Sequence, residues 1–197
     1  MPAFSIEVDS IHRVTVSADG FDVLRVGISG TRIDEGPPHL EIAASKHPQA
    51  GDGSYLIWED GLPVGPGQVV TISMLEDAQT SRPGRTIDEL YPDGPDHVDN
   101  PKTREEIFVE LRSRPSLHEA FEFHLETPKG FRFAGNTSAD EHGFGFGVLW
   151  NSFHPEKARV SLHSYTLDSL EHNSPMSYHV DEVMRSGDSV RFEVVGK

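Results

Sequence analysis

The chain has 197 residues, a formal net charge of −15 at pH 7 and no cysteine. This charge opposes binding to nucleic-acid phosphates and to anionic membranes, whereas it favours basic partners. The lack of cysteine excludes disulfides, thiolate zinc sites and cysteine nucleophiles. The N-terminal residues show no basic and apolar leader, and no apolar run approaches the roughly 20 residues that span a bilayer. We therefore expect a cytoplasmic protein.

Residues 1–75 form the first predicted unit, and strand signals dominate it. Apolar and polar residues alternate over 4–8, 14–16 and 70–74. Alternation with a period of two buries one face of a sheet and leaves the other face in water. Gly and Pro clusters separate these runs, as is typical of turns. The sequence therefore predicts a mainly β fold.

Residues 76–119 form the predicted connection between two units, and its first part is rich in Asp and Glu. A long irregular connection in a compact protein is usually either functional or a solvated linker, and both interpretations remain open. Acidic side chains around a few apolar anchors suit a basic protein partner. The predicted partner-binding residues are Asp88, Glu89, Leu90, Tyr91, Asp93, Asp96 and Asp99.

One short α-helix is predicted at the end of this connection, over about residues 101–114. Asn100 is a suitable cap, Pro101 suits the first helical turn, and Pro115 ends the helix. Three apolar residues at three- and four-residue spacing share one face, which we expect to pack onto a sheet: Ile107, Phe108 and Leu111.

Residues 120–197 form the second predicted unit, which repeats the first. Residues 4–7 (FSIE) match residues 123–126 (FHLE) at a shift of 119, and the shift then becomes 120, which pairs Gly27 with Gly147. A constant shift across aromatic, glycine and aliphatic positions favours duplication over a chance alignment of strands. The prediction is two tandem β units, sandwich- or barrel-like, related by a pseudo-twofold axis. An acidic linker and the short helix join them.

Both units end in a related pattern. Trp58 precedes residues 67–72 (GQVVTI) in the first copy, and Tyr178 precedes residues 187–192 (GDSVRF) in the second. The pattern resembles small, uncharacterised bacterial β-rich proteins in which a Trp and a Leu are followed by Gly-Asp-x-Val-x-Ile/Phe. Gln68 and Tyr178 depart from it. The resemblance implies a bacterial source and a link to toxin–immunity pairs, and it assigns no catalytic residue.

Motifs that would carry chemistry are sparse. The glycine run 143–147 continues as a strand-like segment, so we interpret it as a bare strand face that another backbone can approach, rather than as a phosphate loop. Five second-unit histidines lack zinc-ligand spacing: His142, His154, His163, His172 and His179. The residue types of a nucleophilic triad occur without a G-x-S-x-G elbow, as His163, Asp168 and Ser169. The sequence therefore predicts no catalytic residue, metal site or cofactor.

The leading hypothesis is a non-catalytic protein-binding module, most specifically an immunity-type inhibitor of a basic bacterial toxin. The alternative is a carbohydrate- or small-ligand-binding β-domain that uses Trp58, Tyr178 or Trp150. The aliphatic surroundings of both tryptophans instead favour core positions. A hydrolase that uses second-unit His and Asp residues is the third hypothesis.

Overall fold

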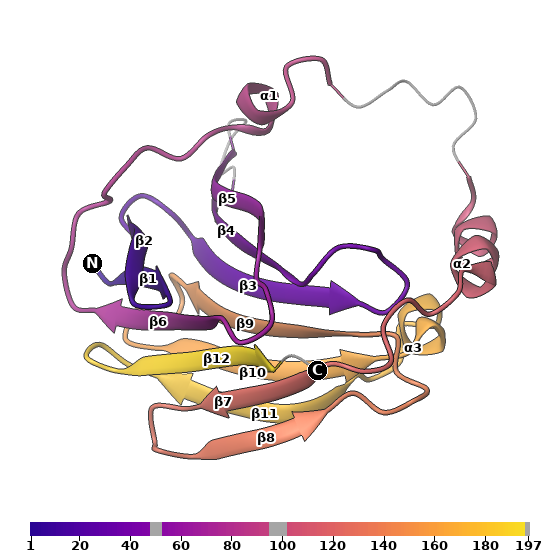
Figure 1. The fold of residues 1–197 in the computed structure, drawn as a ribbon. Coiled ribbons are helices and arrows are strands. Elements are labelled where there is room, and N and C mark those ends of the chain that lie inside the picture. The colour runs from indigo at the N-terminus through magenta and orange to yellow at the C-terminus, as the bar shows by residue number, and fades with distance from the viewer. Residues whose placement is uncertain (48–52, 95–101, 196–197) are drawn as a thin grey trace.

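Two six-stranded antiparallel sheets face each other in the computed structural model, which describes residues 1–47, 53–94 and 102–195 (Figure 1). Sheet A has the order β2–β1–β6–β12–β7–β8, and sheet B the order β11–β10–β9–β3–β4–β5. The strands of sheet A are β1 (Ala3–Val8), β2 (Ile11–Ser17), β6 (Val69–Leu75), β7 (Glu122–Glu126), β8 (Arg132–Asn136) and β12 (Ser189–Val195). Those of sheet B are β3 (Val23–Thr31), β4 (His39–Lys46), β5 (Ser54–Pro63), β9 (Gly143–Asn151), β10 (Ala158–Tyr165) and β11 (Ser177–Met184). The mainly β prediction is confirmed, and the sheets form an open sandwich.

Each unit contributes three strands to each sheet, in matching order. At the centre of the sheets, β6 pairs with β12 and β3 pairs with β9. Thr71 lies opposite Arg191 in sheet A, and Gly27 lies opposite Gly147 in sheet B; the members of each pair are 120 residues apart. A residue that pairs with its own repeat counterpart lies on a twofold axis. The predicted pseudo-twofold relation is therefore confirmed, and its axis passes through the middle of both sheets.

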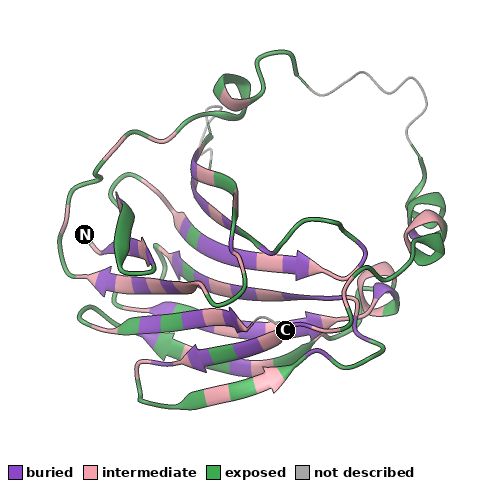
Figure 2. Ribbon diagram, in the orientation of Figure 1, coloured by how far each residue is buried: buried purple, intermediate pink, exposed green. Residues whose placement is uncertain are grey.

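The two units share one apolar core between the sheets. Buried and exposed residues alternate along most strands, as the sequence pattern requires (Figure 2). Phe192 lies at the centre of this core, with its ring stacked on Phe146 at a centroid distance of 4.4 Å and an interplanar angle of 3°. Rings from Phe123 and Phe144 lie 5.9 and 6.0 Å from it. These four rings belong to the second unit, and the same continuous core includes first-unit residues such as Trp58 and Ile72.

The described residues form three short helices: α1 (Ile87–Leu90), α2 (Arg104–Ser113) and α3 (Leu167–Glu171). Each begins at a Thr whose hydroxyl accepts a hydrogen bond from the backbone N–H three residues later. The predicted helix is present as α2, but its cap is Thr103, which forms a capping box with Glu106. The expected cap, Asn100, and Pro101 lie outside the described residues. None of these helices has the length and apolarity needed to cross a membrane.

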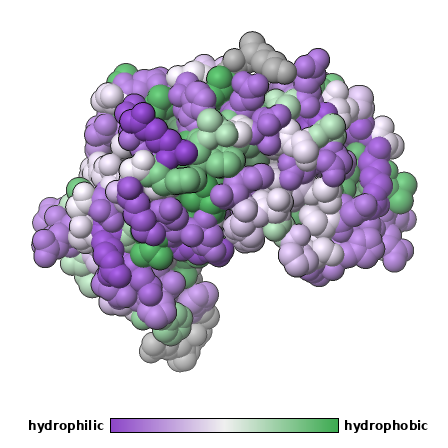
Figure 3. Space-filling view, turned by 90° about the horizontal axis from the view of Figure 1, so that it is seen from below, coloured by the Kyte–Doolittle hydropathy of each residue, from purple (hydrophilic) through white to green (hydrophobic). Residues whose placement is uncertain are grey.

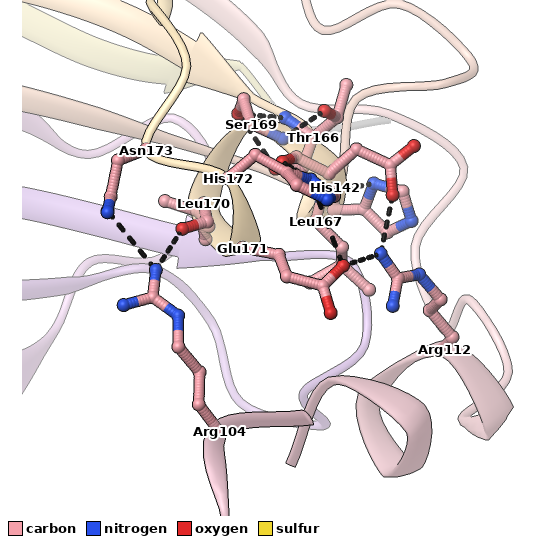
Figure 4. A network of polar contacts seen from close by, with 11 residues as sticks. Arg104, Arg112, His142, Thr166, Leu167, Ser169, Leu170, Glu171, His172 and Asn173 are labelled. Atoms are coloured by element: carbon pink, nitrogen blue, oxygen red, sulfur yellow. Dashed lines mark hydrogen bonds and ion pairs between the residues drawn. The ribbon is translucent and has the colours of Figure 1, made fainter. Parts of the chain in front are cut away.

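The expectation that α2 packs onto a sheet is wrong, because it packs against α3 (Figure 4). Phe108 is its buried residue, whereas Ile107 is 43% exposed and Leu111 is half-buried. Two arginines provide the contact instead. Arg104 donates to the carbonyl of Leu170 (2.5 Å) and to Asn173 Oδ1 (3.1 Å). Arg112 forms ion pairs with Asp168 and Glu171.

The glycine run 143–147 lies in β9, so its strand interpretation is confirmed. Backbone approaches closely at Gly143, where an added Cβ would lie 2.6 Å from the carbonyl oxygen of Gly30. A side chain covers Gly145, which the sequence did not indicate, whereas no side chain lies within 4 Å of a Cβ placed at Gly147. A Cβ at Gly145 would lie 2.7 Å from the ring of His163, which sits directly across on β10.

Candidate functional site

The acidic connection is bonded to both sheets of the sandwich along residues 80–91, which we call the strap (Figure 1). On sheet A it contacts edge strand β2, where Ser81 N–H donates to the carbonyl of Thr15 at 2.9 Å. On sheet B it contacts edge strand β5, where Ile57 and Arg85 exchange two backbone hydrogen bonds of 2.8 Å. The strap therefore covers the β2/β5 edge of the sandwich. These bonds favour an ordered element over a solvated linker.

Trp58 holds the strap through hydrogen bonds to Arg82. Its Nε1 donates to the carbonyl of Arg82 at 2.9 Å, and Arg82 Nη2 donates back to the carbonyl of Trp58 at 2.6 Å. The side chain of Trp58 is 2% exposed and that of Trp150 is 1% exposed. The core interpretation of both tryptophans is therefore confirmed, and neither is free to stack on a sugar. Tyr178 is half-exposed, but the guanidinium of Arg159 lies 5.1 Å from its ring centroid.

Close packing between the strap and Trp58 predicts the effect of enlarging Gly84. A Cβ at Gly84 would lie 3.0 Å from both Leu56 and the indole ring, so a valine cannot fit without moving the strap. We expect Gly84→Val to expose Trp58, which acrylamide quenching of tryptophan fluorescence would detect, and to speed proteolysis within residues 80–91. Gly36→Val is the control, since a Cβ there meets open space. Equal quenching in the two variants would contradict a tightly packed strap.

The strap carries four of the seven predicted partner-binding residues, and Asp93 lies two residues beyond it. Asp96 and Asp99 lie outside the described residues. Asp88 and Asp93 are exposed. Glu89 is occupied, because its carboxylate accepts from the backbone N–H of Thr86 at 2.8 Å and caps α1. Leu90 is half-buried.

Tyr91 joins the end of α1 to β5. Its hydroxyl donates a hydrogen bond to the carboxylate of Asp60, and this bond together with the negative charge of Asp60 raises the pKa of Tyr91. The ring remains 54% exposed, and Ile87 on the same short helix is 51% exposed. Two partly apolar side chains are thus exposed to water close in sequence to the exposed carboxylates of Asp88 and Asp93. The sequence did not single out Ile87 as a site residue, although its place within the acidic cluster was visible.

A buried polar cluster, which sequence reasoning missed, lies at the opposite edge of the sandwich, between β8 and β11. Ser164 Oγ donates to the carboxylate of Glu141 and lies 2.8 Å from His179 Nε2. Phe133 stacks on the His179 ring at 5.5 Å. Figure 3 views the molecule from this side and shows an apolar patch bordered by hydrophilic surface. In the first unit, the position 120 residues before Ser164 is occupied by Ala44, which is buried.

This cluster stabilises the carboxylate of Glu141 and does not activate Ser164 as a nucleophile. A nucleophilic serine passes its proton to a histidine, whereas Ser164 donates to Glu141 and is 0% exposed. Burial raises the pKa of Glu141, but hydrogen bonds from Ser164 and from the Ser138 backbone N–H outweigh it, so the pKa lies below its ordinary value. Glu141 is therefore ionised at neutral pH.

The lowered pKa of Glu141 makes part of the stability depend on pH. A carboxyl group whose pKa is lower in the folded state stabilises the fold above its ordinary pKa, and this contribution is lost as the pH falls through the folded value. We expect Glu141→Gln to flatten the acid side of a plot of unfolding free energy against pH, measured by urea denaturation. The control is Glu35→Gln at an exposed position. Parallel curves for wild type and Glu141→Gln would contradict the assignment.

The triad residue types named from the sequence are not joined by hydrogen bonds in the described part of the chain. Asp168 pairs with Arg112, whose hydrogen bond lowers the pKa of Asp168. Ser169 Oγ donates to the carbonyl of Thr166 at 2.8 Å, and His163 lies on β10. Within the described ranges, no three His, Asp or Glu side chains are grouped so that they could hold a metal ion.

The strap surface around α1 and the Glu141 cluster thus lie at opposite edges of the described part of the sandwich. Comparison with protein-family models, with curated protein sequences and with solved structures finds no match to this chain.

Proposed function

We propose that this chain is a non-catalytic protein-binding module whose strap receives a basic protein partner. The observation that carries the proposal is the pair of half-exposed apolar side chains, Ile87 and Tyr91, held on α1 beside exposed carboxylates. Exposed aromatic and aliphatic side chains with a polar surround are typical of the central contacts in protein interfaces. An immunity-type inhibitor of a basic bacterial toxin is the specific form of this function that we propose.

The net charge of −15 supports the choice of a basic partner. Long-range attraction between opposite charges speeds association, and it weakens as salt is added. Exposed carboxylates at the edge of an interface act mainly on the association rate, whereas a buried anchor acts mainly on dissociation. Asp88 and Asp93 are therefore expected to steer the partner, and Ile87 to hold it.

The experiment is affinity capture from the native host, followed by surface-plasmon kinetics with the captured protein. Asp88→Lys/Asp93→Lys is expected to slow association and to flatten its salt dependence. Ile87→Ala is expected to leave association nearly unchanged and to speed dissociation. Tyr91→Phe separates the role of the hydroxyl, which bonds to Asp60, from the role of the exposed ring, because it removes the hydrogen bond and keeps the ring.

The matched control is Asp19→Lys/Glu35→Lys, which changes the net charge by the same amount at exposed positions outside the strap. If the control slows association as much as Asp88→Lys/Asp93→Lys does, the effect belongs to net charge and not to the strap. If the captured protein is acidic, or if no strap variant changes either rate, the proposal is wrong.

A further inference from the structure

A shallow hollow of about 300 Å³ lies on the outer face of sheet B, away from the strap. It is near the lower limit of the volumes that small-molecule sites occupy. Gly147 leaves part of its floor without a side chain, and Leu149, which is 38% exposed, lies along one side. Its polar side chains come from Arg25, Ser29, Ser161, His163 and Tyr165.

Arg25 gives this hollow a local positive charge. Its guanidinium lies across Gly27, within 3.2 Å of where a Cβ would stand. No ion pair of Arg25 occurs within residues 1–47, 53–94 and 102–195. The nearby Glu41 accepts a hydrogen bond from Tyr55, and Asp181 is paired with Arg159. An unpaired arginine is notable in a chain of net charge −15, because acidic neighbours are abundant.

His163 provides the second polar group without a partner. Its ring covers Gly145, and its Nδ1 is buried with no hydrogen-bond partner. A buried polar atom that makes no hydrogen bond costs free energy. Burial, with the charges of Arg159, His179 and Arg25 in addition, lowers the pKa of His163, so the ring is neutral at pH 7.

We propose that this hollow binds a small planar carboxylate, with the carboxylate on Arg25 and the planar body over Gly147 beside Leu149. The forked guanidinium matches a carboxylate in geometry and charge. A strand face without Cβ atoms leaves flat peptide groups on which a ring can lie. The hollow is separate from the strap, so the test of ligand binding in the hollow is independent of the test of protein binding at the strap.

Gly147 offers a way to fill the hollow without disturbing the fold. A Cβ there meets only the carbonyl oxygen of Val26, at 3.5 Å, which is ordinary van der Waals contact, and its φ lies outside the left-handed region. Valine also favours strand geometry. Gly145 is unsuitable for this purpose, because a Cβ there would strike the ring of His163.

The experiment is an NMR titration of the full chain with benzoate, following the backbone amides of residues 25–29 and 145–149. Two compounds are titrated in parallel. Benzyl alcohol keeps the ring but lacks the charge, and inorganic phosphate is charged but has no ring. We expect saturable shifts with benzoate, at least tenfold weaker binding in Arg25→Gln, and no binding in Gly147→Val. Arg132→Gln, on the exposed sheet A strand β8, should bind as the wild type does.

The spectrum of each free variant shows whether it is folded, so loss of binding is separated from loss of structure. The absence of saturable shifts with benzoate in the wild type would overturn the proposal. Unchanged binding in Gly147→Val, or shifts confined to other residues, would also overturn it. Phosphate that binds as tightly as benzoate would show a simple oxyanion site and refute the planar ligand.

Discussion

Replacing Phe192 by alanine is expected to lower the free energy of unfolding by about 3–5 kcal/mol. The side chain is fully buried, and its ring lies against three rings on two other strands, β7 and β9, the nearest at a centroid distance of 4.4 Å. Truncation removes this apolar surface and leaves a cavity between the two sheets. Because the surrounding rings belong to both sheets, they cannot close the cavity without moving the sheets.

Urea denaturation followed by circular dichroism measures this loss, and Phe131→Ala is its control. Phe131 is 48% exposed, so its truncation is expected to change the unfolding free energy by no more than about 0.5 kcal/mol. A loss in Phe192→Ala as small as that in the control would show that this ring cluster does not hold the two sheets together.

Replacing Gly143 by alanine is expected to cost about 1–3 kcal/mol, as overpacking does in a close-packed interior. The new Cβ would lie 2.4 Å from Tyr165 Oη and 2.6 Å from the carbonyl oxygen of Gly30. A tyrosine hydroxyl can move aside, but the Gly30 carbonyl belongs to β3, next to the Thr31–Gly143 pair that ends the central β3–β9 ladder. The paired strands β3 and β9 must therefore move apart at this end of the ladder to accept the new Cβ.

Gly147→Ala is the matched control on the same strand and the same face. Its Cβ meets only ordinary contact, so we expect a neutral effect or a gain of about 0.4–1 kcal/mol from the less flexible unfolded chain. Thermal and urea unfolding of the two variants measure the difference. If both variants are equally stable, the close approach of β3 to Gly143 does not constrain this position.

The duplication shows which parts of the fold a sequence pattern can predict in this protein. Period-two alternation predicts the strands, because a strand between water and a core must place its side chains on alternate sides. The constant shift of 120 residues predicts the twofold axis, because equivalent strands pack equivalently. Gly67 and Gly187, which precede the central strands of sheet A, both have positive φ, as the shared turn pattern requires.

The sequence also indicated the exposed part of the candidate site. Asp88, Tyr91 and Asp93 stood out as acids around an apolar residue, and such clustering is a local property of the chain. The strap itself was not predictable, because Trp58 bonds to Arg82 across 24 residues and β2 bonds to Ser81 across 66. A turn of helix such as α1 is too short to leave a periodic pattern.

What the sequence by itself determined is therefore the alternation of strands, their duplication and the sign of the net charge. The first depends on neighbouring residues, the second on a fixed shift and the third on composition alone. Only the tertiary structure decided which polar side chains meet. Ser164, Glu141 and His179 come together from separate segments, and Arg25 and His163 meet in one hollow only because β9 lies between their strands. Such contacts depend on how strands are ordered in a sheet, and no local spacing of residues encodes that order.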